Sequence, residues 1–297
     1  MNKDKFMVKE FPEEVFSVSA PVWMTRGKKG GAIMQTWAVC GSRCVLAVDS
    51  PAPEIPGLRE YIEDIFQKPA IMINTHGHID HIGCNRQFSE VYMSRKDWNL
   101  AAGGGIFRSG KTDTAGGLPY KLNDMPEGKR FSLGDRSFTA VSVPGHTAGS
   151  MVLYEQETGI LFGGDAIARR ILYGLSDWTP LEQYKSGLRK IAGLHITKVC
   201  SAHDDFPLPG NMAERILENI DKYLPYTEKV WTSPVDGRIF KQIVTEAGEE
   251  SIDYFSFVIP ADRCEEKENE TCDPDDTVCG RQDAGESDGG VCACLCI

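Results

Sequence analysis

The feature that most constrains this chain is a cluster of histidines directly after a short apolar segment. Residues 70–74 (AIMIN) follow Pro69 and have the aliphatic character of a buried β-strand. Residues 75–81 (THGHIDH) come next and contain three of the six histidines in the chain. A loop that leaves a strand can aim alternate side chains at one point, and imidazole and carboxylate groups bind zinc and neighbouring transition metals. The sequence therefore predicts a metal site at the end of a buried strand.

Three further candidate ligands lie elsewhere in the chain, each just past the end of a predicted strand. They are His146 after the strand 138–143, Asp165 after the strand 160–162 and His203 after the strand 198–201. Neighbouring strands bring their ends to one edge of a sheet, so these side chains are expected to meet the histidine loop. The full set of candidate metal ligands is His76, His78, Asp80, His81, His146, Asp165 and His203. This set exceeds the needs of one tetrahedral ion and suits two divalent ions that share a bridging carboxylate.

The rest of the body alternates strand-like and helix-like segments. Apolar runs at 34–39 and 44–48 predict two strands joined by a hairpin turn at Gly41-Ser42. Apolar residues at helical spacing predict helices over 58–66, 181–191 and 212–220. The second of these helices is expected to begin with Thr179 as its N-cap and Glu182 at the capping-box position.

Two other segments have a different character. Residues 103–128 are rich in glycine and show no period, so they predict a long functional or mobile loop. Lys111 in this loop is a candidate for binding an anionic substrate, with an ordinary exposed loop charge as the alternative. Tyr173 is a candidate for lining the substrate pocket, with packing as the alternative. Residues 230–258 predict a final hairpin.

Charge divides the chain into a body and a tail. Residues 262–297 carry eleven Asp or Glu and three Lys or Arg, which gives −8 of the total net charge of −11. The body is therefore close to neutral and offers no basic surface for nucleic acid. No apolar run reaches the length of roughly 18 residues that a membrane span needs, and no secretory signal is recognised, so we expect a cytoplasmic protein. A small-molecule substrate is the expected partner, and the oligomeric state stays open.

The ten cysteines divide in the same way. Six of them lie in the tail, at Cys264, Cys272, Cys279, Cys292, Cys294 and Cys296. The acidic composition predicts a disordered tail, and its cysteines suggest soft-metal binding, disulfides or an appended carrier peptide. Cys40 and Cys44 flank the predicted hairpin turn and could face one another, although a cytoplasmic location favours free thiols. We therefore expect a catalytic domain over 1–261, with its core at about 15–225, and a disordered, Cys-rich tail over 262–297.

The ligand pattern resembles that of the metallo-β-lactamase superfamily. The mark of that family is a His-x-His-x-Asp-His loop followed by separate His, Asp and His ligands, and all of them are present here in order. The resemblance implies an α/β (α+β) fold, a four-layer αββα sandwich with a two-metal site at one edge of its sheets. It also implies that His76, His78 and His146 hold one ion, that Asp80, His81 and His203 hold the second, and that Asp165 bridges them.

Departures from particular branches of the family narrow the expected activity. Asp165 stands where the best-known zinc β-lactamases have cysteine, and His78 stands where the flavodiiron reductases have glutamate. Glyoxalase II and the lactonases share every ligand, although a basic glutathione-binding domain is not obvious here. The resemblance therefore implies a binuclear hydrolase, with zinc as the expected metal. A metal-bridging hydroxide would attack a small acyl substrate, such as a thioester, lactone or amide, and Asp80 would be the catalytic residue that orients it.

An oxidative activity is the alternative. Persulfide dioxygenases are similar to glyoxalase II but use a single iron ion, which His76, His146 and Asp165 would hold in this chain. The sequence separates the two activities poorly, so the metal content distinguishes zinc-dependent hydrolysis from iron-dependent oxidation.

Overall fold

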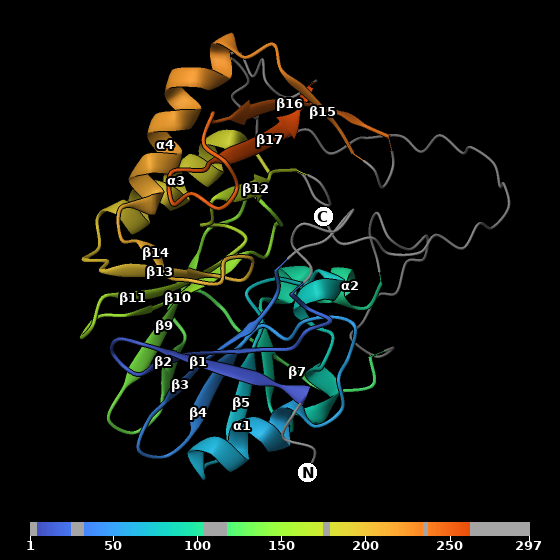
Figure 1. Cartoon of the computed structure of the whole chain (residues 1–297), viewed down its shortest axis with the longest axis vertical. Helices are drawn as coiled ribbons and strands as arrows, with labels where there is room; N and C mark the ends of the chain where they lie inside the picture. Colours follow the sequence, from blue (N-terminus) through green and yellow to red (C-terminus); the bar gives the residue numbers. More distant parts are fainter. Residues whose placement is uncertain (1–4, 25–32, 104–117, 175–178, 234–236, 262–297) are drawn as a thin grey trace, which may run out of the picture.

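The structure is a computed structural model that describes residues 5–24, 33–103, 118–174, 179–233 and 237–261. Lys111 and the tail 262–297 lie outside the described residues, so the expectations for them stay predictions. The described part contains three β-sheets and four α-helices (Figure 1). Within this part, no helix combines the length and the apolar character that crossing a bilayer requires.

The first sheet has seven strands and leads into the predicted histidine loop. In chain order, which is also their order in the sheet, the strands are β1 (Met7–Phe11), β2 (Val15–Ser19), β3 (Thr36–Cys40), β4 (Val45–Val48), β5 (Ala70–Ile73), β6 (Val91–Met93) and β7 (Leu122–Asp124). Strands β1 to β4 pair in antiparallel fashion, whereas β4 to β7 run parallel. The predicted strand before the histidine loop is β5, and its aliphatic run suits a position between two parallel neighbours.

The second sheet has six strands in the order β14-β13-β11-β10-β9-β8. They are β8 (Arg130–Ser132), β9 (Ser137–Ser142), β10 (Met151–Glu155), β11 (Ile160–Gly164), β13 (Lys198–Ser201) and β14 (Leu208–Pro209). All pairs are antiparallel except β11 with β13, which is parallel. Strands β9, β11 and β13 therefore run in one direction, and the residues that follow them gather at one edge of the sheet.

Apolar side chains hold the two sheets face to face. Trp37 and Leu46 of the first sheet and Phe138 and Phe162 of the second are fully buried in this core. Burial of each such side chain contributes about 1.5–3 kcal/mol. The sheets thus form the two inner layers of the sandwich.

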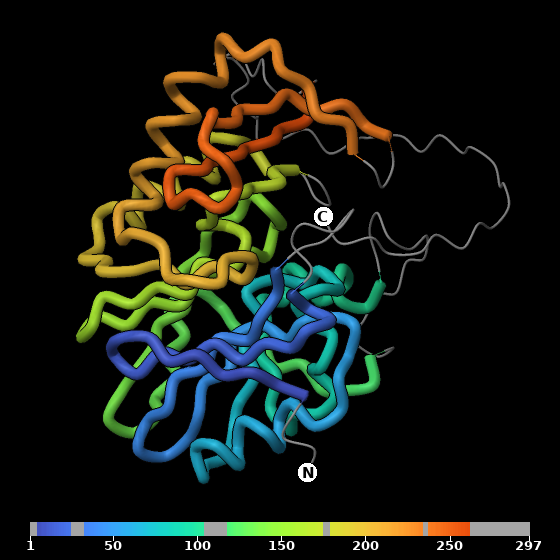
Figure 2. Tube along the Cα trace, in the orientation of Figure 1, coloured from blue at the N-terminus to red at the C-terminus, as the bar shows by residue number. Residues whose placement is uncertain are grey.

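Helices cover the outer faces of both sheets (Figures 1 and 2). The helices are α1 (Leu58–Phe66), α2 (Trp98–Ala101), α3 (Leu181–Ala192) and α4 (Met212–Tyr223), with short 3-10 helices η2 (Ile79–His81), η3 (Asn85–Gln87), η4 (Arg95–Asp97) and η6 (Leu224–Tyr226). Leu58 and Ile62 of α1 pack on the first sheet, whereas Leu188 of α3 and Ile216 of α4 pack on the second. The predicted αββα order of layers is confirmed.

A third sheet extends the sandwich beyond the prediction. Its four strands lie in the order β12 (Arg170–Leu172), β17 (Ser256–Pro260), β16 (Ile239–Val244) and β15 (Val230–Thr232). The predicted final hairpin accounts for only part of it, because β12 comes from before α3 and pairs in parallel with β17. Ile171, Ile243 and Phe257 of this sheet join the core around α3 and α4. The sheet is therefore built onto the second half of the sandwich.

Three local predictions are wrong. The predicted loop 103–128 contains strand β7. This strand has only three residues and pairs with β6 at the edge of the first sheet, so it is too short to show a period in the sequence. Helix α3 has Pro180 at its N-cap, and Thr179 Oγ1 is buried without a hydrogen-bond partner among the described residues. Cys40 and Cys44 do not face one another but pack on opposite faces of the first sheet, because side chains alternate between faces along a strand. Both are free thiols, as expected from the sequence.

Candidate metal centre

The seven candidate ligands stand at the ends of strands from both sheets. Four lie in the loop after β5, with Asp80 and His81 in the 3-10 helix η2. His146 follows β9, Asp165 comes directly after β11, and His203 follows β13. The structure brings all seven together in two groups and a third set that links them, and within each the potential ligand atoms lie within 4.8 Å of one another. The first group is His76, His78 and His146, the second is Asp80, His81 and His203, and the linking set is His76, His81 and Asp165.

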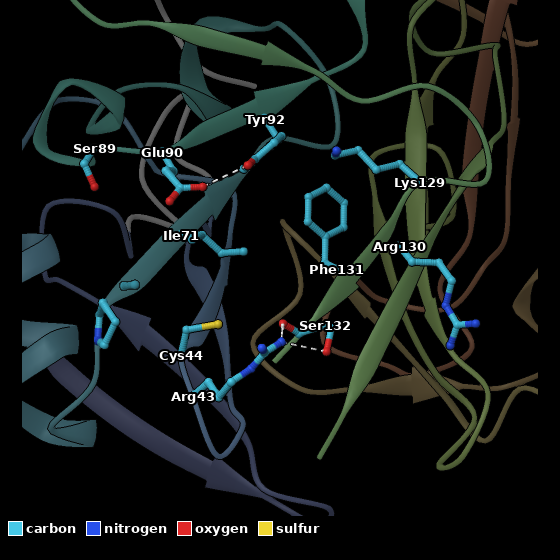
Figure 3. Close-up of a pocket in the computed structure, with 12 residues that line it drawn as sticks. Arg43, Cys44, Ile71, Ser89, Glu90, Tyr92, Lys129, Arg130, Phe131 and Ser132 are labelled. Atoms are coloured by element: carbon cyan, nitrogen blue, oxygen red, sulfur yellow. Dashed lines mark hydrogen bonds between the residues drawn. The ribbon is translucent and has the colours of Figure 1, made fainter. Parts of the chain in front are cut away.

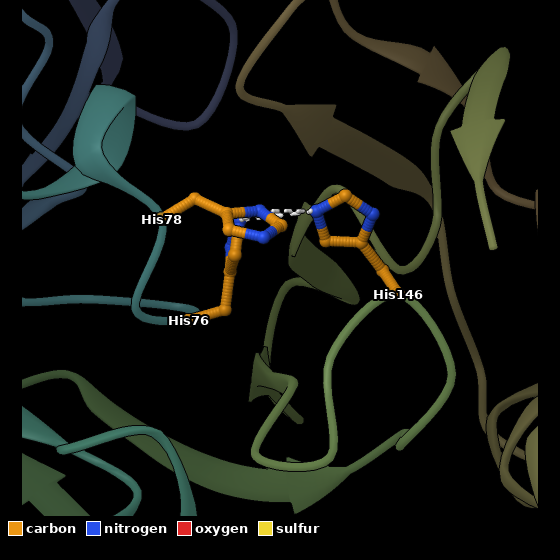
Figure 4. Close-up of side chains that lie close together, drawn as sticks. All are labelled: His76, His78 and His146. Carbon is orange, nitrogen blue, oxygen red and sulfur yellow. Dashed lines mark hydrogen bonds between the residues drawn. The ribbon is translucent and has the colours of Figure 1, made fainter. Parts of the chain in front are cut away.

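The first group consists of three buried imidazoles whose nitrogens converge (Figure 4). His76 Nε2 lies 3.0 Å from His78 Nδ1 and 3.2 Å from His146 Nε2. The remaining pair, His146 Nε2 and His78 Nδ1, is 2.8 Å apart. Three nitrogens around one tetrahedral zinc stand about 3.4 Å apart when each Zn–N bond is about 2.1 Å. A small outward movement of the three rings gives this spacing.

The second group is more open and includes a carboxylate. Asp80 Oδ2 lies 3.9 Å from His81 Nε2 and 3.7 Å from His203 Nε2. Asp165 stands between the two groups, with Oδ1 at 3.5 Å from His81 Nε2 and Oδ2 at 3.3 Å from His203 Nε2. The same Oδ2 atom is 3.5 Å from His146 Nε2 in the first group. Asp165 therefore has the position that a carboxylate shared by two ions requires.

Unsatisfied polar atoms indicate that the space between these side chains can bind a cation. His81 Nε2 and Asp165 Oδ1 are buried and have no hydrogen-bond partner among the described residues. Buried polar atoms without partners are costly, and binding a cation is one of the few ways to satisfy them. The donor set of imidazoles and carboxylates is that of zinc and related divalent metals. The residues present fit two metal ions.

Burial keeps the first group neutral. Burial and the charge of His146 lower the pKa of His78 to about 3. Burial also lowers the pKa of His76 and of His146, and for His76 the neighbouring histidines add to the effect. Neutral imidazoles have free lone pairs, so this group is ready to bind a cation.

The carboxylates have the opposite effect on the second group. Burial opposes protonation of His81 and His203, but the Asp165 carboxylate beside both outweighs it. The pKa of His81 is raised well above its ordinary value, and that of His203 is raised to about 9. Despite burial, the charges of His203 and His81 lower the pKa of Asp165 well below its ordinary value. In the metal-free chain, the Asp165 carboxylate therefore favours the protonated form of both histidines.

We expect the affinity for a second divalent ion to rise with pH between 6.5 and about 9. The ion must displace protons from His81 and His203, and His203 loses its own at pH about 9 instead of 6.5. Each displaced proton makes the binding constant rise by about tenfold per pH unit below the pKa. Zinc titrations against a chromophoric chelator at several pH values measure this slope, and proton release in a weak buffer counts the protons.

The folding stability of the metal-free chain has the opposite pH dependence and falls as the pH rises. The raised pKa means that protonated His203 stabilises the fold at pH below 6.5, and this contribution is lost as the pH rises through about 9. Thermal unfolding of the metal-free chain checks it. An affinity for zinc that stays constant over this pH range would contradict both expectations.

Asp49 is a buried support that the sequence prediction missed. It follows β4 with a φ angle of 57°, and its Oδ2 atom lies 3.0 Å from His81 Nδ1. The same carboxylate accepts hydrogen bonds from Thr75 N and Thr75 Oγ1, both at 2.8 Å. This contact fixes the ring of His81 with Nε2 toward the candidate site, as carboxylate partners do for metal-binding histidines.

Backbone carbonyls orient two other histidines. His146 Nδ1 donates to Leu172 O of β12 at 2.9 Å, and His203 Nδ1 donates to Ile33 O at 2.8 Å. Each bond leaves Nε2 facing the other ligands. Leu172 belongs to the third sheet, so that sheet takes part in shaping the site.

Asp97, in η4, ties the two ligand loops together. Its Oδ2 accepts from Gly77 N at 2.9 Å and from Thr147 Oγ1 at 2.7 Å, and its Oδ1 accepts from Gly149 N at 2.7 Å. A Cβ atom at Gly77 or Gly149 would lie within 3.0 Å of atoms of Asp97, which explains glycine at both positions. One buried carboxylate thus fixes the loop of His76 against the loop of His146.

An Asp97→Asn variant should fold less stably and bind zinc more weakly. The amide presents N–H groups where the carboxylate accepts hydrogen bonds, so at least one buried donor loses its partner. The expected costs are about 2 kcal/mol in unfolding free energy and about 10-fold to 100-fold in zinc affinity. Urea unfolding and chelator competition measure them. Asp124→Asn is the control, because Asp124 makes an exposed bond to Arg95 N. Equal effects in both variants would rule out the proposed role.

Two other buried side chains, Tyr173 and Cys84, lie away from the candidate metal centre. Tyr173 is fully buried, and its ring packs near Tyr184 and Phe257. The structure shows this packing role, and pocket lining by Tyr173 stays a prediction. Cys84 is buried in the core around α1, where burial raises the pKa of its thiol to about 12. Neither side chain belongs to the candidate metal groups.

Comparison with known proteins agrees with this geometry. Residues 67–203 match the family model described as the metallo-beta-lactamase superfamily. The solved structure of a metallo-beta-lactamase from Pontibacter korlensis superposes with a TM-score of 0.56 over 73% of this chain and 99% of that protein, at 18% identity. Residues 67–203, which contain all seven candidate ligands, belong to the metallo-β-lactamase superfamily. The superposition shows the shared fold, and the resemblance that the ligand pattern implied is confirmed.

Two curated relatives are hydrolases by name. A hydroxyacylglutathione hydrolase of Gloeothece citriformis is 33% identical over 54% of this chain and 60% of its own length. The human acyl-coenzyme A thioesterase MBLAC2 is 26% identical over 54% of this chain and 62% of its own length. The chain spans only about 60% of the length of these relatives.

Proposed function

We propose that this protein is a binuclear metal-dependent hydrolase that cleaves a small acyl substrate, with thioesters as the first class to test. The observation that carries the proposal is the complete set of seven ligands around Asp165, which contacts both ligand groups. A degenerate member of the family kept only for binding has no need of every ligand. Zinc suits the imidazole and carboxylate donors, and two ions suit the two groups.

The chemistry of the proposed reaction needs no serine or cysteine nucleophile. Two divalent ions, when bound, would lower the pKa of water toward neutrality and polarise an acyl carbonyl. Charges of His81 and His203 outweigh burial and lower the pKa of Asp80, so its carboxylate is ionised. Asp80 is the half-buried group at the edge of the site, and it can accept a hydrogen bond from the attacking water and orient it. The buried histidines around it exclude bulk water.

Thioesters are favoured within the acyl class by the relatives. Their names describe one relative acting on a hydroxyacylglutathione and another acting on acyl-coenzyme A, and both compounds join an acyl group to a thiol. Lactones and amides have the same carbonyl chemistry and follow as second choices. A small-molecule substrate in this class is therefore the partner that we propose.

The first test is the metal content of the full-length chain. The six tail cysteines are replaced by serine, so that zinc bound to thiols does not enter the count. We expect about two zinc ions per chain, followed by hydrolysis of acylglutathione and acyl-coenzyme A thioesters in a thiol-release assay. About one iron ion per chain, with no thioester hydrolysis, would overturn the proposal and favour persulfide oxidation. His76→Ala is the control, since it removes a ligand and should lower both the metal content and the activity.

A further inference from the structure

A second concave site lies at the other end of the sandwich from the candidate metal centre. The metal ligands follow the last residues of β5, whereas a cleft of about 470 Å³ opens beside its first residue, Ala70 (Figure 3). Its lining comes from the starts of β4, β5 and β6 on one side and from β8 on the other. The cleft therefore opens between the two sheets, and its volume is that of small-molecule sites.

The floor of the cleft is apolar. Phe131 of β8 is buried, and Ile71, Tyr92 and Cys44 are half-buried against the core between the sheets. Figure 3 shows the Phe131 ring standing in the middle of the cleft between the two sheets. An aromatic ring and an aliphatic side chain at the base suit a flat apolar ligand, which gains both burial and ring contact there.

The rim of the cleft carries three cationic side chains. Among the described residues, Arg43, Lys129 and Arg130 form no ion pair with an Asp or Glu. Arg43 Nη2 donates to Ser132 O at 3.2 Å and Oγ at 3.0 Å, which holds its guanidinium beside the floor. Lys129 Nζ lies 5.1 Å from the centre of the Tyr92 ring and 5.6 Å from that of Phe131.

The one acidic group of the lining is already engaged. Glu90 Oε2 accepts a hydrogen bond from Tyr92 OH at 2.8 Å. Arg130 donates to Ser137 Oγ at 3.0 Å, and in Figure 3 its guanidinium points away from Phe131. Arg43 and Lys129 thus remain as the cations that flank the ring. The cleft therefore has positive charge over an apolar floor, in a body whose own net charge is close to zero.

We propose that this cleft binds a small organic anion with a flat apolar body, of the class of aromatic carboxylates. The apolar body lies over Phe131 and Ile71, and the carboxylate lies at the rim beside Lys129, with Arg43 on the other side of the ring. Guanidinium and ammonium groups form charge-assisted hydrogen bonds with carboxylates, whereas a neutral ligand cannot accept such bonds through a negative charge. The site is separate from the metal ligands, so the inference does not depend on the proposed hydrolase activity.

Two cysteines on one hairpin provide a site-specific test. Cys44 faces the cleft, whereas Cys40 lies on the opposite face of the same sheet, and both are half-buried. Trypsin cleaves after Arg43 and places the two cysteines in different peptides. Labelling of the full-length chain with N-ethylmaleimide, followed by mass spectrometry, reports on each thiol. The probe is 2-naphthoate, and 2-naphthamide is its neutral counterpart.

We expect 2-naphthoate to protect Cys44 and leave Cys40 unchanged. At about ten times the dissociation constant, labelling of Cys44 slows by about tenfold, because only the free chain reacts. Lys129→Gln removes one charge-assisted hydrogen bond, so about tenfold more 2-naphthoate is needed for the same protection. Arg130→Gln is the matched control, which removes the same charge from the rim and keeps the protection.

Three results would overturn the proposal. The first is the absence of protection up to the solubility limit of 2-naphthoate. The second is equal protection by 2-naphthamide, which means that the cleft binds apolar groups without regard to charge. The third is an equal loss of protection in Lys129→Gln and Arg130→Gln, which means that only the overall charge of the chain matters.

Discussion

An Asp165→Asn variant is expected to retain at most one metal ion and to lose on the order of a thousandfold in kcat/KM for any thioester that the unsubstituted chain hydrolyses. The carboxylate of Asp165 lies 3.3–3.5 Å from ring nitrogens of His81, His146 and His203. An amide has no charge to offset two cations, and it contributes one oxygen instead of two. Both ligand groups therefore lose a donor in a single substitution.

The same substitution changes the protonation of the second group. Asp165 is the main cause of the raised pKa of both His81 and His203, which burial alone would lower. The metal-free variant should therefore lose most of the pH dependence of stability expected between pH 6.5 and about 9. Elemental analysis after dialysis, thiol-release kinetics and thermal unfolding at several pH values measure the three effects. Asp135→Asn is the control, since Asp135 is exposed and bonds to Ser42 N on the turn of the β3–β4 hairpin. Two ions per chain in Asp165→Asn would show that the carboxylate does not bridge.

The ligands could be predicted from the sequence because each depends on a local pattern. Strand β5 is marked by its aliphatic run, and the histidines follow it within the same short loop. His146, Asp165 and His203 each follow a strand of the second sheet, and three strands that run in one direction bring them to a single edge. The positions of the side chains then follow from the direction of the strands.

The supporting residues could not be found in this way. Asp49 and Asp97 look like ordinary acidic residues after a strand and in a short helix, and only the folded chain brings them to His81 and to the ligand loops. Strand β12 has three residues, and its partner β17 lies more than eighty residues later, so no local pattern indicates the third sheet. Contacts between distant segments decide these features, and periodicity carries no information about them.

The contact between Arg169 and Asp204 is the strongest example of a contact between distant segments. Removing it should destabilise the fold. Both side chains are almost fully buried, at 3% and 5% exposure, and Arg169 Nε donates to Asp204 Oδ1 at 2.7 Å. Arg169 also donates to Ser251 O and, at 3.0 Å, to Glu249 O, which connects the loop between β16 and β17 of the third sheet to the residue after His203. Arg169→Met leaves the Asp204 carboxylate buried without its cation. The expected cost is about 3–5 kcal/mol in unfolding free energy.

A neighbouring ion pair gives the matched control for Arg169→Met. Arg170 Nη2 lies 2.6 Å from Glu249 Oε1, but these side chains are 32% and 52% exposed. Water screens such a pair, so Arg170→Met should cost at most about 1 kcal/mol. Urea unfolding of both variants compares the two arginines directly.

A double variant separates charge from packing. Arg169→Met with Asp204→Asn removes the unpaired charge and should recover part of the stability lost in Arg169→Met alone. Zinc affinity should fall by about 10-fold to 100-fold in Arg169→Met, because Asp204 holds the loop of His203 through Ser201 Oγ at 2.8 Å. If Arg169→Met and Arg170→Met lose equal stability and bind zinc equally well, the third sheet does not support the metal centre. Unequal losses of stability, with weaker zinc binding in Arg169→Met only, would show that the third sheet helps to position His203.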